Sequence, residues 1–255
     1  MTAPRLSPGL APALAVWVLY SILTFVIQSS SGIPYAEWFR TAANTWRTGV
    51  LSLAAGSVLL VGWVALTRWD HLWRDPRPLP VTGVMKVAMG VWIASIALRL
   101  GGIDWQAVPL DLLLPIVVSG VLVGFAEETL FRGFVLRALR EGGRAESSAA
   151  LWTAVGFGLF HLPNVLMGTG AVGVIQVFLA ALSGSVLYVF RRHTGRLWPA
   201  MVAHGAWDIS TFLAGGYALP WLNALTLPML GLSVILGIAV LVSILRGDRH
   251  TVALA

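Results

Sequence analysis

Long apolar stretches alternate with short polar connections along almost the whole chain. A membrane-spanning helix needs about 20 predominantly apolar residues. No stretch shows the sustained alternation of apolar and polar positions that a half-buried strand or a membrane barrel requires. The pattern therefore predicts an all-α protein, a polytopic membrane helix bundle with about eight transmembrane helices. The expected spans are residues 10–28, 49–67, 82–100, 111–131, 148–167, 171–190, 197–214 and 225–245.

The first apolar stretch and the segment that follows it need separate interpretation. Residues 10–28 are long for a signal peptide and lack a clear small-residue cleavage site, so we expect a retained helix. Residues 34–48 are too polar to span a membrane, and their aromatic residues Trp38, Phe39 and Trp46 fall near one helical face. Such a segment is predicted either to lie flat at the interface or to form a plain loop.

Composition limits the class of protein further. The 255 residues are 57% hydrophobic and 11% charged, whereas a soluble domain is about 45–50% apolar and roughly 25% charged. These values exclude an ordinary soluble enzyme, a disordered chain and a nucleic-acid binder, and they make the lipid bilayer the first expected partner. The chain has no cysteine, which excludes disulfides, thiolate metal sites and cysteine nucleophiles. No polar connection is long enough to fold alone, so residues 1–255 are expected to form one domain.

The basic residues are distributed unevenly between the two sides that the predicted spans define. If both ends of the chain lie on one side, 13 basic residues are on that side and 3 on the other. Because Lys and Arg are retained on the cytoplasmic side, we expect a multi-pass protein of the cell membrane with both termini cytoplasmic. The first group is Arg5, Arg68, Arg74, Arg77, Lys86, Arg137, Arg140, Arg144, Arg191, Arg192, Arg196, Arg246 and Arg249, and the second is Arg40, Arg47 and Arg99.

Six ionisable residues are carried by three of the predicted spans, with Arg132 directly at the end of its span. An ionisable side chain deep in a span costs roughly 2.5–3.5 kcal/mol, so these groups must face one another or a water-filled cavity. Glu128 and Arg132 are four residues apart and share a helix face, whereas Glu127 is rotated away from that face. The six are Glu127, Glu128, Arg132, His161, His204 and Asp208.

This set of side chains suits the hydrolysis of a peptide bond. Hydrolysis needs a base that activates water and donors that stabilise the developing oxyanion. Two histidines and a glutamate also form a familiar catalytic zinc set, so a second hypothesis makes Glu127, His161 and His204 ligands of Zn²⁺ or another divalent metal. Each residue taken singly also has a structural explanation, since a Glu–Arg pair can clasp a bundle and Phe157 can simply belong to the core.

Three short motifs within residues 111–214 resemble a known family. Residues 127–132 read EExxxR, residues 157–161 read FxxxH, and residues 204–208 read HxxxD. Three such motifs in this order on separate spans are similar to those of the CPBP (CAAX protease and bacteriocin-processing, or Abi) intramembrane proteases, which include the type II CAAX prenyl endopeptidases.

The resemblance implies a role for each motif residue. Glu127 would activate the hydrolytic water together with His161, and His204 and Asp208 would stabilise the oxyanion. Glu128 would be held by Arg132 as a structural pair, and Phe157 would pack against the site. The third motif also occurs with Asn in its last position. Because an ionised Asp208 cannot donate a hydrogen bond as an amide does, it would be protonated, orient His204 or bind a metal. The family is commonly labelled a metalloprotease, and its motifs alone do not decide between a metal and a metal-free glutamate mechanism.

The first functional hypothesis is therefore an intramembrane endopeptidase that acts on a membrane-associated protein or peptide. A proton- or ion-coupled transporter is the first alternative, because buried Glu, His and Asp also form proton relays. The absence of similar charges in the first three spans and of an internal repeat argues against it. The second alternative is a non-catalytic immunity or scaffold protein of the membrane that has kept an inherited site.

Overall fold

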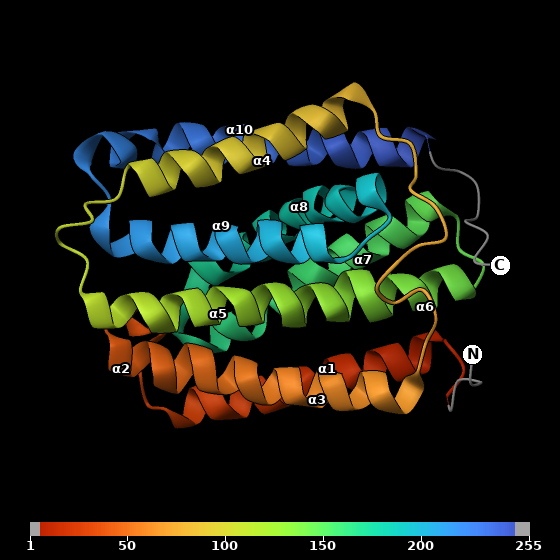
Figure 1. The fold of residues 1–255 in the computed structure, drawn as a ribbon, viewed down its shortest axis with the longest axis horizontal. Coiled ribbons are helices and arrows are strands. Elements are labelled where there is room, and N and C mark those ends of the chain that lie inside the picture. Colours follow the sequence, from red (N-terminus) through yellow and green to blue (C-terminus); the bar gives the residue numbers. More distant parts are fainter. Residues whose placement is uncertain (1–5, 248–255) are drawn as a thin grey trace.

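Each of the eight predicted spans corresponds to a helix in the computed structural model, which describes residues 6–247 (Figure 1). The main helices are α1 (Leu10–Ser30), α3 (Leu51–Thr67), α4 (Gly83–Gly101), α5 (Leu110–Glu128), α7 (Glu146–Phe160), α8 (Gly170–Thr194), α9 (Trp198–Tyr217) and α10 (Pro220–Gly247). Short helical segments connect some of them, and the described part of the chain contains no strand. The all-α class and the polytopic helical bundle are therefore confirmed.

Length and composition alone would make 6 segments of the described chain long and apolar enough to cross a membrane. The two main helices outside this set are α7 and α9, which carry His161, His204 and Asp208. α7 has only 15 residues, or about 22 Å at 1.5 Å per residue, which is less than the roughly 30 Å hydrocarbon core. The remaining polar residues of the three motifs, Glu127, Glu128 and Arg132, lie within the candidate span Leu110–Glu141.

The polar segment at residues 34–48 is not one flat amphipathic helix. It consists of the 3₁₀ turn η1 (Tyr35–Glu37), the short α2 (Ala42–Thr45) and the start of the π-helical η2 (Trp46–Val50), which leads directly into α3. Trp38 is buried, and Phe39 stacks on Phe212 of α9 with the ring centroids 3.7 Å apart. Trp38 and Phe39 therefore pack within the bundle, whereas Trp46 is exposed. The second helical span begins earlier than the predicted residue 49.

The helix that carries the first motif extends beyond its predicted end at residue 131. α5 continues through the π-helical η3 (Thr129–Val135) into α6 (Leu136–Glu141). A π-helix changes the backbone hydrogen-bonding register, and single π-turns are frequent at functional sites. The backbone carbonyl of Arg132, inside η3, accepts a hydrogen bond from the guanidinium of Arg191 on α8. The irregular turn directly after Glu128 is thus supported by a side chain from another helix.

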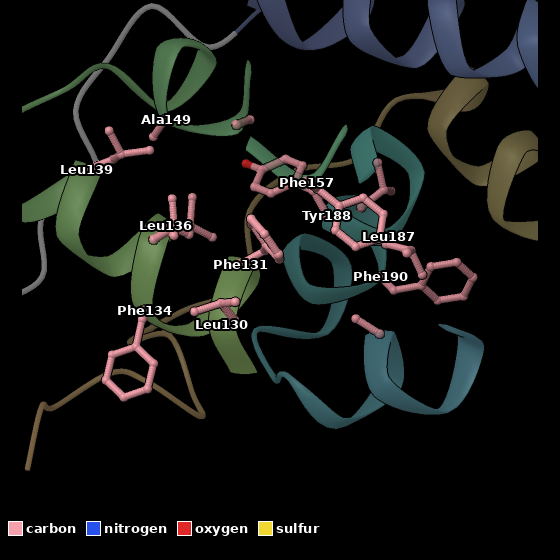
Figure 2. Packing of buried hydrophobic residues seen from close by; sticks show 14 of the residues in the cluster. Leu130, Phe131, Phe134, Leu136, Leu139, Ala149, Phe157, Leu187, Tyr188 and Phe190 are labelled. Carbon is pink, nitrogen blue, oxygen red and sulfur yellow. The ribbon is translucent and has the colours of Figure 1, made fainter. Parts of the chain in front are cut away.

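α5 occupies a central position in the bundle. It packs against α3 on one side and α9 on another, while α4 lies beside α10 and α7 lies beside α8 (Figure 1). The main core is built around the aromatic and aliphatic residues of η3, α6 and α8. Figure 2 shows Phe131 close to Phe157 within it, with the ring centroids 5.3 Å apart in an edge-to-face arrangement. This packing fixes α7 against the helix that carries Glu127 and Glu128.

A buried ionic network holds the end of the bundle at which α1 begins and α10 ends (Figure 1). Arg140 contacts Asp75 at 2.9 Å and Glu146 at 2.6 Å, and Arg191 contacts Asp75 at 2.6 Å. Burial alone would raise the pKa of the Asp75 carboxyl, but Arg191 and Arg140 together hold that pKa below its ordinary value. The network joins the loop before α4 to α6, α7 and α8.

This shared end carries most of the basic residues that define the predicted topology. The start of α1 and the end of α10 lie at the same end of the bundle (Figure 1). The charge distribution predicts the same arrangement, because it requires an even number of passes. Arg5 and Arg249 lie outside the described residues. Several apolar helices support a multi-pass membrane protein, whereas the cytoplasmic position of this end stays a prediction from the basic residues.

Candidate active site

Glycine allows α5 and α9 to approach closely enough to bring the first and third motifs together. A methyl group at Gly124 of α5 would overlap the Met201 carbonyl oxygen, and one at Gly205 would overlap the backbone of Gly120. Both contacts are with backbone atoms, which cannot move as a flexible side chain can. Small residues at such positions let the backbones of membrane helices pack directly, and here they set the distance between Glu128 and His204.

We therefore expect Gly124→Ala to separate α5 from α9. Overpacking of this kind costs about 1–3 kcal/mol, and it should lower both the melting temperature in detergent and any activity of the site. Gly90→Ala is the matched control, because Gly90 also lies inside a membrane helix but has no atom within 4 Å of an added methyl group. Equal melting temperatures for the Gly124 and Gly90 variants would contradict the proposed role of this contact.

Glu128 is the hub of the hydrogen bonds in the site. One carboxylate oxygen accepts from Arg132 at 2.9 Å and from the Nδ1 atom of His204 at 2.8 Å. Arg132 also donates to the Gly184 carbonyl at 2.9 Å and lies over the Phe157 ring. The side chains of Glu128 and Arg132 are completely buried. The predicted ion pair is thus present, and Glu128 additionally orients His204, a contact that the sequence did not predict.

Glu127 and Asp208 both face the other nitrogen of His204. The His204 Nε2 atom lies 3.9 Å from a Glu127 oxygen and 3.7 Å from an Asp208 oxygen. That Glu127 oxygen has no hydrogen-bond partner although it is buried. Two carboxylates around one ring nitrogen favour a proton on that nitrogen, because opposite charges stabilise the charged imidazolium. Glu127 is the acid of the site that forms no ion pair with an arginine among the described residues, and its nearest cationic group is the His204 ring.

His161 lies at the end of α7, with its ring fixed by its own helix. Its Nδ1 atom is 2.9 Å from the Phe157 carbonyl oxygen. Because a carbonyl only accepts hydrogen bonds, Nδ1 carries the proton and Nε2 of a neutral ring has a free lone pair. The Phe157 ring packs edge-on against both His161 and His204, with centroid distances of 5.1 and 5.5 Å. Phe157 therefore fixes the relative position of the two imidazoles, as its predicted packing role requires.

A cavity of about 520 Å³ connects these side chains. Its wall includes Glu127, Phe157, His161, His204 and Asp208, together with aromatic residues from several helices. Glu128 and Arg132 do not line it. The structure thus separates the sequence-predicted residues into a group that faces the cavity and a buried pair behind that group. This division agrees with the predicted roles but does not test them.

The histidines and acids do not form a ready three-ligand metal site. A catalytic zinc ion is usually held by three protein ligands at about 2.0–2.2 Å. Among residues 6–247, no three His, Cys, Asp or Glu side chains are grouped in a way that could hold a metal. His204 donates a hydrogen bond from Nδ1 to Glu128, so Nε2 is the nitrogen that faces the other acids. A metal held by Glu127, His161 and His204 stays a prediction, and no step below uses a metal.

Sequence reasoning missed two residues in the cavity wall. Tyr20 of α1 is fully buried, and its hydroxyl has no hydrogen-bond partner. Arg99, near the end of α4, was interpreted only as a charge flanking a span, whereas its guanidinium lies over the Trp207 ring of α9 and lines the cavity. A single tyrosine in an apolar span carries no signal. Arg99 lies in the last turn of α4, a position that is equally typical of a charge flanking a span, so the sequence carried no signal for its place in the cavity wall.

Comparison with known families covers the part of the chain that carries the three motifs. Residues 109–210 match the family model described as type II CAAX prenyl endopeptidase Rce1-like. This match confirms the family resemblance that the three motifs predict. The matched range includes every candidate catalytic residue and excludes α1, α3 and α4.

The similarity to this family supports a membrane protease, and so a peptide hydrolase, in general terms. The search of curated proteins finds no match, and neither does the search of solved structures. The Rce1-like match and the geometry of the cavity are therefore the two observations from which a function is inferred.

Proposed function

We propose that the chain is an intramembrane endopeptidase that hydrolyses a peptide bond of a membrane-associated protein or peptide. The observation that carries this proposal is the Glu127 carboxylate, which faces a cavity beside two oriented imidazoles and has an oxygen without a hydrogen-bond partner. A desolvated glutamate that no arginine holds is suited to act as a general base. The Rce1-like family supports the same class of reaction.

In the proposed reaction, Glu127 and His161 activate one water molecule. The water oxygen attacks the carbonyl carbon of the substrate, and its proton passes to the Glu127 carboxylate. The Nε2 lone pair of His161 accepts a second hydrogen bond from the same water, since Nδ1 is bonded to the Phe157 carbonyl. When the tetrahedral intermediate collapses, the C–N bond breaks and Glu127 returns its proton to the leaving amine.

His204 is the proposed donor to the oxyanion. Glu128 accepts a hydrogen bond from Nδ1, so Nε2 points toward Glu127, Asp208 and the cavity. In the proposed reaction the ring is an imidazolium, because Nε2 can donate only when it carries a proton of its own. A donor fixed before the reaction begins stabilises developing charge without reorganisation, and removing one such donor typically costs about 10²–10³ in kcat. We propose that Asp208, 3.7 Å from Nε2, favours the protonated form of His204, which is one of the roles expected for an acid at the last position of the third motif.

The cavity wall favours an apolar peptide as the substrate. Aromatic side chains from α4, α7 and α9 line it, including Trp92, Phe160 and Trp207. Several helices contribute residues to the cavity wall. The outer surface of the bundle carries many exposed apolar residues. We propose that the substrate is held at the cell membrane, with both chain termini on the cytoplasmic side, as the basic residues indicate.

The proposed mechanism predicts that cleavage does not depend on a metal. Peptide cleavage by purified protein should persist after treatment with 1,10-phenanthroline, because Glu127, His161 and His204 do not form a metal-ligand set. Elemental analysis of the same preparation should find less than one zinc per chain. Loss of cleavage on chelation, with recovery on adding Zn²⁺, would contradict the metal-free mechanism while supporting the peptidase assignment.

A further inference from the structure

Arg99 projects from α4 into the same cavity as the proposed catalytic residues. The carbon of its guanidinium lies 3.8 Å from the centroid of the Trp207 ring. One of its terminal nitrogens, Nη1, is buried and has no hydrogen-bond partner. Among residues 6–247, no carboxylate is within ion-pair distance of this side chain, although Asp208 is near enough to interact with its charge.

Trp207 holds the Arg99 guanidinium in a fixed position. Trp207 also stacks against Trp92 of α4, with the ring centroids 4.0 Å apart. Trp92 is itself fixed by a hydrogen bond to the Ala203 carbonyl at 3.0 Å. Arg99 and Trp92 are seven residues apart and so share a face of α4. The cation is therefore positioned before any ligand arrives, which reduces the entropy lost on binding.

A guanidinium in a membrane helix needs more compensation than one aromatic ring provides. Its insertion costs roughly 2.5–3.5 kcal/mol, and a cation–π contact returns about 0.5–2 kcal/mol. The unbonded nitrogen shows that part of its hydrogen-bonding capacity is unused. A carboxylate is the group that matches a planar guanidinium best, because two parallel hydrogen bonds form at once.

We propose that Arg99 is a substrate-binding residue that takes a carboxylate of the peptide. The inference rests on the proposed function and extends it to the chemistry of the substrate. The carboxylate is either the C-terminal group of the peptide or an Asp or Glu side chain near the cleaved bond. Arg99 would then fix the position of the peptide relative to Glu127, which lines the same cavity.

The test compares fluorescent apolar heptapeptides in matched pairs. One pair differs only in a free C-terminal carboxylate against an amide. In the other pair, both peptides are amidated and one carries Glu where the other carries Gln. We expect wild-type protein to favour the carboxylate member of one pair by about 10–100-fold in Kd and in kcat/KM, as charge-assisted hydrogen bonds allow. The pair that responds identifies the source of the carboxylate.

Arg99→Gln should remove this preference, leaving both members of that pair within about 3-fold of each other. Arg99→Lys keeps the charge without the planar fork, so it should retain part of the preference. The matched control is Arg40→Gln, because Arg40 is exposed, lies just before α2 and does not line the cavity. If wild-type protein favours neither carboxylate, or if Arg99→Gln weakens both members equally, Arg99 is only a counter-ion of Asp208 and the proposal is wrong.

Measuring binding separately from cleavage distinguishes this proposal from the proposed function. Equilibrium binding of the same peptides is measured with Glu127→Gln as well as with wild-type protein. An Arg99-dependent carboxylate preference without any cleavage by wild-type protein would support the binding site and contradict the peptidase. Cleavage without that preference would support the peptidase and contradict the proposed role of Arg99.

Discussion

Glu127→Gln is expected to lower peptide-bond cleavage by about 10²–10⁴-fold, the usual contribution of a general base. The substitution keeps the size of the side chain but removes the carboxylate that would accept the proton of the attacking water. Because Glu127 forms no ion pair with an arginine among the described residues and one of its oxygens lacks a hydrogen bond, the variant should fold normally. The measurement is kcat on a cleavable peptide, together with the melting temperature in detergent.

Two further variants make this result interpretable. Glu127→Ala should be as inactive as Glu127→Gln, since both lack the carboxylate. Glu37→Gln should behave as wild type, because Glu37 is exposed in η1 and does not line the cavity. Full activity of a well-folded Glu127→Gln protein would contradict the assignment of Glu127 as the general base.

Arg132→Ala is expected to have the largest effect on stability. It would leave the completely buried Glu128 without its arginine partner, and breaking a buried pair in this way costs about 3–5 kcal/mol. The loss should be measured as a lower melting temperature and a lower yield of monodisperse protein. Arg137→Ala is the matched control: Arg137 forms an ion pair of the same spacing, but its partner Glu141 is 45% exposed and stays hydrated.

A double variant separates the structural role of the pair from its effect on the site. Replacing both residues with apolar ones, as in Glu128→Leu with Arg132→Met, removes the unpaired charge and should restore much of the stability lost in Arg132→Ala. Activity should stay low, because His204 would lose the acceptor that orients its ring. A stable double variant with normal cleavage would show that Glu128 does not position His204.

The helices of this fold were largely predictable from the sequence, because apolar stretches of membrane length leave little alternative to a helix. Their ends were less predictable. The extension of α5 to residue 141 depends on a π-turn and on Arg191, which donates to a carbonyl inside that turn. Similarly, the polar segment at residues 34–48 packs inward through Phe39 because Phe212 offers a stacking partner. Contacts of this kind depend on distant residues and leave no local pattern.

The candidate site was predictable where charge is costly in a membrane. Glu127, His161, His204 and Asp208 were identified because ionisable groups inside apolar spans need a shared polar environment, and all four line one cavity. Their individual connections were not predictable. Glu128, interpreted only as the partner of Arg132, also binds His204, and Arg99 turns inward because Trp207 stacks against it. Helix rotation decides both contacts, and spacing along one helix does not determine the rotation of its neighbour.

The spacing of Glu128 and Arg132 also has a consequence for biosynthesis. The other partners of this pair, Gly184 and His204, come from α8 and α9, which are synthesised later. When α5 first enters the bilayer these later partners are absent, whereas Glu128 is already present on the same helix as Arg132. A pair four residues apart forms as soon as that helix does, so the charge of Arg132 is compensated before α8 and α9 are inserted. The Glu128 carboxylate that pairs with Arg132 during insertion then accepts a hydrogen bond from His204 when α9 packs beside α5.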